Sequence, residues 1–476
     1  MEKQNAQPLS LRTALMPLLV LIVLLAVNVW VYGDDALGGS NQFILLVGGA
    51  VAALVGFAQK HSYKTMLDKV ADNLKSVTGA ILILLFVGAL AGTWLIGGII
   101  PGMIYYGLQI LHPSIFLPAC VVICALISLA TGSSWTTSAT VGIALIGIGK
   151  ALGVPVGMVA GAVISGAYFG DKLSPLSDTT NLAPAMAGGD LFQHIRYMTL
   201  TTVPSILVTL VVFIILSFTI SSSGSADTAQ MLASIDAVFN INLWLFVVPL
   251  LVIVLIVRKT PPLVALFVGT VLGAVSALIF QQDVLVNLGG SLSLESSYRV
   301  IMDAITVHTQ IETTNPMLND LFSSGGMEGM LGTIWLIICA MVFGGIMDGI
   351  GALAAISRAL LSWAQTTFQL FASTVASCLA INITASDQYL SIVVPGKMFQ
   401  KAYRDRGLAP ENLSRTLEDS GTVTSVLIPW NTCGAYQSGV LGVGVAEYFV
   451  YAIFNWLSPF MTLLFAALQI KIKALR

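Results

Sequence analysis

The sequence predicts an all-α polytopic membrane protein made of two inverted-topology repeats, with re-entrant hairpins and unwound transmembrane helices, in about 10–13 membrane segments. Three observations lead to this class. Hydrophobic residues make up 56% of the 476 residues and charged residues only 9%, whereas soluble domains carry about 25% charged residues. Apolar runs long enough to span a bilayer recur along the chain, whose mean hydropathy is +0.90. Several of these runs are interrupted by polar residues and proline.

The composition also excludes several functional classes. Lys and Arg total 21 against 23 Asp and Glu, so no basic surface indicates a nucleic-acid partner. The five cysteines all lie in apolar runs without disulfide spacing, and the four histidines form no metal constellation. The sequence has no phosphate-binding loop, nucleophile elbow or zinc signature. We therefore expect neither an enzyme nor a cofactor, and no metal beyond a transported ion.

The windows of spanning length follow a polar tail, 1–13, that we expect to be cytoplasmic. The first window is too long for the apolar core of a signal peptide, so we expect it to be a retained span. Whether 114–152 forms two spans or one hairpin is open. In order, the windows are 14–32, 41–58, 77–100, 114–131, 136–152, 156–188 (interrupted), 198–220, 243–257, 261–281, 330–350, 369–396 (interrupted), 418–446 (interrupted) and 448–469.

Loop charges predict the orientation, because cytoplasmic loops carry the excess of Lys and Arg. Basic residues precede the first window, follow the second and separate the eighth from the ninth. The loop 33–40 carries only the acids Asp34 and Asp35, and 282–329 holds one Arg against six acids. We therefore expect both termini in the cytoplasm. The basic residues concerned are Lys3, Arg12, Lys60, Lys64, Lys69, Lys75, Arg258 and Lys259.

The segment 397–415 does not fit a chain in which every apolar window crosses the bilayer once. It carries five basic residues and should be cytoplasmic, so the preceding window, 369–396, must enter and leave the bilayer on the same side. We expect a re-entrant hairpin there, with its tip at Asn382–Asp387.

The two halves of the chain repeat one order of features: two spans, a polar excursion, a Gly-rich span, a polar-tipped segment, an interrupted span and a closing span. Thr131 and Thr384 are 384 − 131 = 253 residues apart, and Asp171 and Asp419 are 419 − 171 = 248 residues apart. The first unit starts inside and the second starts outside. Inverted repeats with matching breaks indicate a secondary transporter whose site lies where the halves meet. The expected units are 14–220 and 243–476, joined by an external linker at 221–242.

The stretch 166–181 is the strongest candidate for a binding site. It places Asp171, Pro175 and Asp178 between apolar runs. Proline breaks a helix, and opened backbone or carboxylates at membrane depth are tolerated only around a hydrated, protein-enclosed cavity. The alternative is a surface loop in which Lys172 neutralises one of the acids. The expected cation and proton site consists of Asp171, Asp178, Thr179, Asn181 and Asp387, whose oxygens suit a small hard cation.

Other polar residues gather at the two tips and at the second interrupted span, where Pro429 predicts another break. Hydroxyls can also bond to the preceding helical turn or hold helices together, and Trp135 can be an interfacial anchor. Glu418 is a weaker candidate because the alternative for it is a position at the membrane surface. The expected lining residues are Thr131, Ser133, Ser134, Thr136, Ser174, Asn382, Thr384, Ser386, Asp419, Thr422, Asn431 and Thr432, with Asp348 as a secondary candidate.

Two runs carry a family resemblance. Residues 170–184, GDKLSPLSDTTNLAP, closely resemble the signature region of NhaC-type sodium/proton antiporters, and residues 421–434, GTVTSVLIPWNTCG, resemble the corresponding second-half region. The resemblance implies a multi-pass secondary transporter of the ion transporter superfamily in a bacterial inner membrane, with elevator-like movement of a transport domain. Similar proteins also exchange malate and lactate or carry amino acids, so the cargo is open.

These observations favour exchange of sodium for protons. Desolvation favours the neutral form of a buried carboxylic acid, whereas sodium among hydroxyl, amide and backbone oxygens favours the ionised form. An acid that either ion occupies, but not both, therefore couples the two ions, and we nominate Asp171.

The alternative is sodium- or proton-coupled transport of a small organic acid or amino acid, held by half-helix N-termini. The sequence offers no obvious membrane-embedded Arg for an organic anion, which favours the cation. A channel is disfavoured because no repeated filter or charged ring is visible. The expected partners are sodium, protons and the lipid bilayer; the assembly state is open, a homodimer being one alternative.

Overall fold

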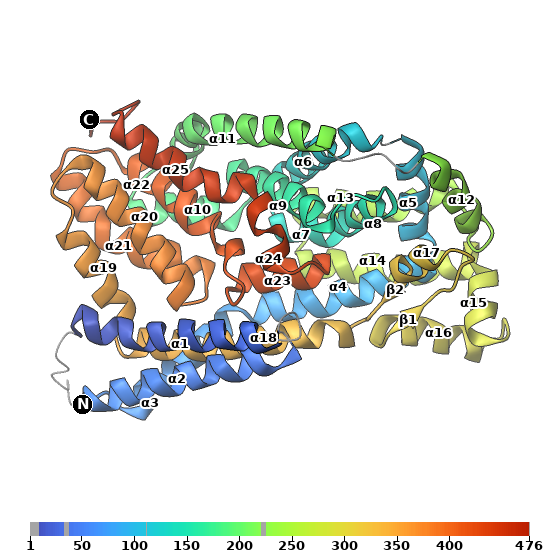
Figure 1. Ribbon diagram of the computed structural model, residues 1–476, viewed down its shortest axis with the longest axis horizontal. Coiled ribbons are helices and arrows are strands. Elements are labelled where there is room, and N and C mark those ends of the chain that lie inside the picture. The colour runs from blue at the N-terminus through green and yellow to red at the C-terminus, as the bar shows by residue number, and fades with distance from the viewer. Residues whose placement is uncertain (1–8, 33–37, 111, 220–224, 476) are drawn as a thin grey trace.

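The computed structural model describes residues 9–32, 38–110, 112–219 and 225–475 (Figure 1). Within these ranges the chain is helical apart from its connecting turns and one short antiparallel strand pair, in which Thr309 lies opposite Ser324. Three features named in the sequence lie outside the described residues: most of the polar tail (1–8), the acids of the 33–40 loop, and the start of the predicted linker (221–224) together with residue 220 before it.

The elements of the first half are α1 (Leu11–Tyr32), α2 (Ser40–Ala58), α3 (Tyr63–Ser76), α4 (Thr78–Ile96), α5 (Ile99–Ile110), α6 (Pro113–Thr131), α7 (Ser134–Thr137), the π-helical η2 (Ser138–Gly142), α8 (Ile143–Ala151), α9 (Val156–Leu173), α10 (Asp178–Ala187), α11 (Leu191–Thr219) and α12 (Ser225–Asp236). The second half contains η3 (Leu243–Phe246), α13 (Val247–Val257), α14 (Pro262–Phe280), α15 (Gln282–Gly289), α16 (Leu294–Thr306), β1 (Thr309–Gln310), α17 (Pro316–Leu321), β2 (Ser323–Ser324), η4 (Glu328–Met330), α18 (Leu331–Gly349), α19 (Ala352–Ser362), α20 (Thr367–Thr384), α21 (Gln388–Asp405), α22 (Pro410–Leu417), the π-helical η5 (Glu418–Thr422), η6 (Ser425–Leu427), α23 (Thr432–Leu441), α24 (Val445–Tyr448), η7 (Phe449–Tyr451) and α25 (Ile453–Ala467).

The predicted all-helical, multi-span membrane class is confirmed. Among the described residues, eight helices are long and apolar enough to cross a bilayer: α1, α2, α4, α6, α11, α14, η4 with α18, and α20. A ninth candidate is the pair Val445–Tyr451 and Ile453–Ala467, which is bent by 51°. The number is below the predicted 10–13 segments for two reasons. The interrupted windows 156–188 and 418–446 form shorter helices separated by breaks, such as α9 and α10 on either side of Pro175, and the windows 136–152 and 243–257 form helices too short to count as spans.

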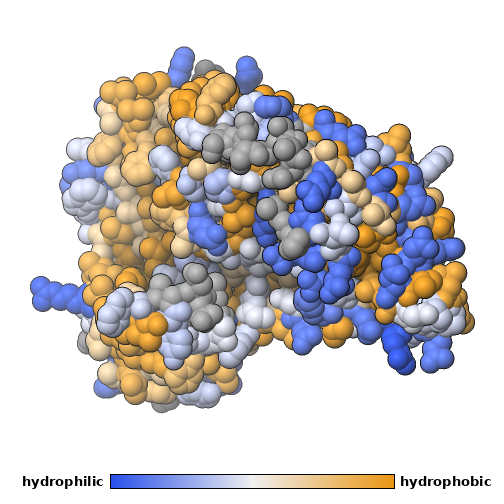
Figure 2. Space-filling model, turned by 45° about the vertical axis from the view of Figure 1, so that its right-hand side comes forward, coloured by the Kyte–Doolittle hydropathy of each residue, from blue (hydrophilic) through white to orange (hydrophobic). Residues whose placement is uncertain are grey.

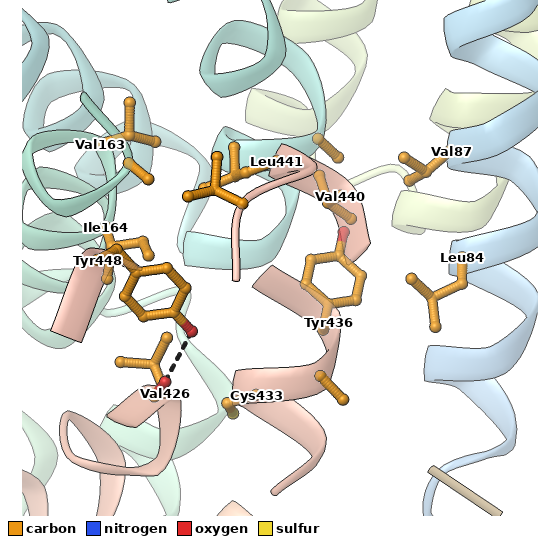
Figure 3. Packing of buried hydrophobic residues seen from close by; sticks show 14 of the residues in the cluster. Leu84, Val87, Val163, Ile164, Val426, Cys433, Tyr436, Val440, Leu441 and Tyr448 are labelled. Carbon is orange, nitrogen blue, oxygen red and sulfur yellow. Dashed lines mark hydrogen bonds between the residues drawn. The ribbon is translucent and has the colours of Figure 1, made fainter. Parts of the chain in front are cut away.

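The helices form two groups (Figure 1). In one group α18 packs against α2 and α3, α1 packs against α2, and α4 packs against α14. In the other group α6 packs against α9 and α11, α20 against α21, and α25 against α9 and α11. Helix α23 of the second group contacts α4 and α18 of the first. Figure 3 shows this contact, where Tyr436 and Val440 of α23 face Leu84 and Val87 of α4.

The long helices run along one axis of the molecule. In Figure 1, α1 begins and α25 ends at the same end, whereas α12, α15, α16 and the two strands lie at the opposite end. Large apolar side chains, among them Trp30, Phe218 and Leu250, are exposed on α1, α11 and α13. Figure 2 shows broad hydrophobic areas beside a region where hydrophilic side chains gather, as expected for a surface that contacts lipid along its middle.

Glycines bring α6 and α9 into unusually close contact. An added Cβ at Gly166 would lie 2.2 Å from the carbonyl oxygen of Val121, and one at Gly170 would lie 2.3 Å from that of Ala125. Small residues allow this backbone-to-backbone approach between membrane helices. Helix α9, which carries Asp171, is therefore held directly against α6.

We expect Gly166→Ala to destabilise the protein, because the new methyl group must push α9 away from Val121. Overpacking of this kind costs about 1–3 kcal/mol, which a thermal unfolding scan in detergent would detect as a lower midpoint. Gly332→Ala is the matched control, since nothing lies within 4 Å of the added Cβ there. Equal midpoints for both variants would contradict the close packing.

Candidate functional site

The two polar tips and both helix breaks contribute to one cavity of about 300 Å³. Residues from α7, α9, α10, α21 and α23 meet there with the first residues of α4 and α14. Seven residues nominated from the sequence line it: Ser133, Thr136, Asp171, Asp178, Thr179, Asp387 and Thr432. The cavity is also lined by Ser76, Val77, Gly79, Ala80, Ile83, Gly132, Trp135, Ser177, Pro262, Gln388 and Tyr389.

The first tip forms because a glycine ends one helix and a serine starts the next. Helix α6 ends at Gly132, which has the left-handed φ of 72° that glycine adopts without strain. Ser133 then caps α7, its hydroxyl accepting a hydrogen bond from the Thr136 backbone N–H at 3.1 Å. Within 114–152, two helical arms therefore meet at a turn beside the cavity, and both alternatives, two spans and one hairpin, place a turn there.

Asp171 lies in the last turn of α9, directly before the break at Pro175. Its carboxylate oxygen Oδ2 accepts hydrogen bonds from the Ser134 hydroxyl at 2.6 Å and from the Ser134 backbone N–H at 3.1 Å. The side chain is buried, at 8% exposure, yet forms part of the cavity wall. The first tip thus orients the nominated acid, and donors that favour its ionised form are already in place.

The break after α9 leads to Ser177, which caps α10. Asp178 is the first residue of α10; it is exposed and lines the cavity. Asn181 does not line the cavity: its amide donates to the carbonyl oxygens of Pro175 at 2.9 Å and of Ser177 at 2.7 Å. Asn181 therefore stabilises the broken segment instead of offering a ligand.

The second tip has the same local geometry as the first. Ser386 adopts a left-handed φ of 59°, and Asp387 caps α21 by accepting a hydrogen bond from the Leu390 backbone N–H at 2.8 Å. Gly132–Ser133 and Ser386–Asp387 are thus matching pairs 386 − 132 = 254 residues apart. Asp387 is 2% exposed and lines the cavity opposite the first-half residues, so an acid from each half reaches the same space.

Several nominated polar residues serve to hold the second tip in place. Asn382 donates to the Gly421 carbonyl oxygen at 2.8 Å and to the Thr424 hydroxyl at 3.0 Å. The Asn431 amide donates to the backbone carbonyl of Asn382 at 3.1 Å, and Thr384 bonds to the preceding helical turn. Among the nominated residues described here, those outside the cavity lining are Thr131, Ser134, Ser174, Asn181, Asn382, Thr384, Ser386, Asp419, Thr422, Asn431 and Asp348.

Asp419 is placed differently from the sequence expectation. It forms a fully buried ion pair with Lys172, and its second carboxylate oxygen accepts hydrogen bonds from Thr201 at 2.9 Å and from Thr462. The pair links the two broken segments, and neither residue lines the cavity. In the sequence alternative, Lys172 neutralises an acid within residues 166–181. In the structure the partner of Lys172 is Asp419, from the other half of the chain.

Asp348 also lies outside the cavity. It pairs with Lys69 of α3 at 3.0 Å, and this contact raises the pKa of Lys69. Trp135 is not an interfacial anchor, since it lines the cavity and stacks on Tyr436 with ring centroids 3.9 Å apart.

Arg415 lies at the end of the segment 397–415, which the loop charges predict to be cytoplasmic. It is fully buried, with its guanidinium 4.6 Å from the Tyr197 ring centroid and 5.8 Å from that of Phe465. Loop-charge rules count residues and do not report side-chain direction. A buried Arg is therefore present, although it does not line the cavity.

A polytopic helical fold around an acid-lined cavity defines a membrane transport protein. Residues 166–470 match the model of the Na+/H+ antiporter family, and the chain belongs to that family, as an NhaC-type member. It is a secondary transporter and a multi-pass membrane protein, not an enzyme.

Relatives within the family carry different cargoes. The chain is 37% identical over 420 residues to the Na+/H+ antiporter NhaC of Alkalihalophilus pseudofirmus, covering 88% of each chain. It is 36% identical over 419 residues to the malate-2H+/Na+-lactate antiporter of Bacillus subtilis, covering 88% of this chain and 86% of that one. It is 31% identical over 460 residues to the arginine/ornithine antiporter ArcD of Halobacterium salinarum, covering 96% and 91%.

Proposed function

We propose that this protein exchanges sodium for protons across a bacterial inner membrane by means of a carboxylate that either ion can occupy. The observation that carries the proposal is that Asp171 and Asp387, from opposite halves of the chain, line one cavity at the helix breaks. The family membership supports sodium and protons as the transported ions.

The chemistry of the cavity suits a small cation. Three acids, Asp171, Asp178 and Asp387, line it together with the hydroxyls of Ser133, Thr136, Thr179 and Thr432, and none of the described lining residues is Lys or Arg. Carboxylate and neutral oxygens are the preferred ligands of hard cations. Sodium binding requires ionised Asp171, and a proton neutralises it, so the two ions compete. A buried, empty and ionised site crosses the membrane poorly because its charge is uncompensated.

The placement of two cavities supports alternating access. The acid-lined cavity touches Val77 and Pro262, which follow the Lys-rich helix α3 and the Arg258–Lys259 turn, both predicted to be cytoplasmic. A second cavity of about 500 Å³ is lined by Gln42, Thr333 and Glu447, beside loops predicted to be external. Helix α23 contributes to both.

We assign these features to one transport cycle. The group containing α6–α11 and α20–α25 moves against the group containing α1–α4, α14 and α18, so that the bound ion reaches the predicted cytoplasmic side and the predicted external side in turn. The expected inverted repeats, 14–220 and 243–476, then supply one hairpin and one broken helix each to the moving group.

A second candidate is sodium- or proton-coupled exchange of a small organic solute. Its specific support is the cavity volume of about 300 Å³, which lies at the lower end of the range for small-molecule sites and far exceeds one dehydrated ion. The three acids without a basic partner favour a solute with a cationic group over malate or lactate.

Purified protein in liposomes distinguishes the candidates. A sodium jump in the absence of any organic solute should change the internal pH, as reported by a trapped pH dye. The same vesicles are then loaded with lactate, malate or arginine, and labelled solute is tested for counterflow. A pH response that appears only with one of these solutes would replace the first proposal with the second.

Ser134→Ala should shift the pH dependence of exchange to higher pH. The variant removes the hydroxyl that donates to Asp171 at 2.6 Å and keeps the backbone donor. A hydrogen bond to a charged group is worth about 1.5–3 kcal/mol, and about 1.4 kcal/mol corresponds to one pH unit, so we expect a shift of about one to two pH units. Sodium-driven exchange is measured in steps between about pH 6 and pH 10.

Thr140→Val is the control for this variant, because its hydroxyl bonds only to the preceding turn, to Thr136 at 2.8 Å and Thr137 at 3.4 Å. An unshifted profile for Ser134→Ala would show that Asp171 is not the titrating acid.

A further inference from the structure

The acid-lined cavity ends at a contact between α23 and α4. Along α4, the lining of this cavity runs from Gly79 to Ile83. Along α23, Thr432 lines the acid-lined cavity, whereas Ala435, about one helical turn further on, lines the second cavity. The side chains that follow Ile83 on α4 and Thr432 on α23 therefore stand at the boundary between the two cavities.

The side chains at this boundary are apolar and buried. Tyr436 and Val440 of α23 face Leu84 and Val87 of α4 (Figure 3), and all four are buried. Trp135 of α7 completes the set, because it lines the acid-lined cavity and stacks on Tyr436. We refer to Trp135, Tyr436, Val440, Leu84 and Val87 as the seal.

Tyr436 is the central member of the seal. Its ring lies against the Trp135 ring with centroids 3.9 Å and planes 18° apart. Its hydroxyl donates to the backbone carbonyl oxygen of Trp135 at 3.1 Å. Tyr436 is itself fully buried and lines neither cavity, so it forms the layer directly behind the Trp135 wall.

The seal is a poor path for ions. Its five side chains carry no charge, and the Tyr436 hydroxyl is already engaged with the Trp135 carbonyl oxygen. An ion that leaves water for such a contact loses its hydration without gaining a partner, which is very costly. Narrow apolar constrictions also exclude water, and a proton needs a chain of waters or titratable groups to cross.

We propose that Tyr436 makes the exchange obligatory, because as the centre of the seal it keeps the acid-lined cavity from joining the second cavity. This inference rests on the proposed function, in which the two cavities serve opposite sides of the membrane. Removal of the Tyr436 ring leaves an empty space and a Trp135 carbonyl oxygen without its donor. A water molecule needs about 30 Å³ and polar partners, and the vacated space supplies both. Water then connects the two cavities, and ions cross without exchange.

The test measures leakage in the absence of sodium. Purified full-length protein is placed in sodium-free liposomes that contain a trapped pH dye, while potassium and valinomycin hold the membrane potential at zero. Sodium/proton exchange cannot contribute to the decay of a preset pH gradient under these conditions. We expect the decay rate for Tyr436→Ala to rise at least about tenfold above that of the unmodified chain, which corresponds to a barrier lowered by about 1.4 kcal/mol.

Two control variants separate the seal from general damage to the core. Tyr436→Phe keeps the ring and should decay at the rate of the unmodified chain. Tyr448→Ala removes another fully buried tyrosine ring, whose hydroxyl donates to the Val426 carbonyl oxygen at 2.8 Å (Figure 3) and which lines neither cavity. It should lower the unfolding midpoint without raising the decay rate.

Leu84→Ala opens the same contact from α4 and should also raise the decay rate, so it decides the question if Tyr436→Ala does not fold. A folded Tyr436→Ala variant that decays no faster than the unmodified chain, or no faster than Tyr448→Ala, would overturn the inference. The proposed function is tested separately by a sodium jump on the unmodified chain. A missing pH response there would contradict the proposed function, whereas the sodium-free leak would still report on the seal.

Discussion

Asp171→Asn should abolish sodium-driven proton exchange. The asparagine keeps the size of the side chain but removes both the negative charge that holds sodium and the group that takes up the proton. Interaction between unit charges about 4 Å apart is worth about 4 kcal/mol at an effective dielectric constant of about 20, and about 1.4 kcal/mol is a factor of ten, so sodium affinity should fall roughly 100-fold or more. Exchange is measured as the pH change that a sodium jump produces in liposomes.

Asp348→Asn is the matched control for this experiment. Asp348 is likewise an acid in an apolar helix, but it lies outside the cavity and pairs with Lys69. We expect it to retain exchange. If Asp171→Asn retained exchange to the same degree, Asp171 would not be the shared site.

Lys172→Gln should give the largest loss of stability. The substitution leaves Asp419 as a fully buried acid with only the hydroxyls of Thr201 and Thr462 as partners. Removal of one partner of a buried ion pair costs about 3–5 kcal/mol. The unfolding midpoint of the detergent-solubilised variant should be markedly lower. Unfolding is measured as the loss of the monodisperse peak in size-exclusion chromatography after heating.

The double variant Lys172→Gln with Asp419→Asn separates this explanation from a general packing defect. Removing both charges leaves no uncompensated ion, so part of the lost stability should return. If the stability losses of the two single variants add up in the double variant, Lys172 and Asp419 do not compensate each other's charge, and the explanation is wrong.

The fold class and the helix breaks could be predicted because they depend on local properties. Low charge and long apolar runs predicted the spans, and proline predicted the ends of helices near Pro175 and Pro429, where α9 ends at Leu173 and α23 begins at Thr432. The basic segment 397–415 and the polar run Asn382–Asp387 predicted the second tip, where Ser386 and Asp387 lie between α20 and α21.

Side-chain direction could not be predicted in the same way. Asn382 and Asn431 have the chemistry of ligands, yet they bond to each other and to the backbone of the neighbouring segment. Asp419 matches Asp171 in the predicted repeat, but its carboxylate pairs with Lys172 and does not line the cavity. Arg415 and Glu418 stand beside a basic loop in the sequence, and only tertiary packing reveals that both are buried.

Direct measurement of sodium binding as a function of pH tests the central claim that one carboxylate is shared by sodium and a proton. The dissociation constant for ²²Na+ on the purified protein should rise about tenfold for each pH unit below the titration range of the shared acid, with the number of sites unchanged, since each bound sodium must displace one proton. The Asp171→Asn variant should lose this dependence along with its high affinity. A dissociation constant that is the same at every pH would contradict the account, because sodium and protons would then occupy separate and independent sites.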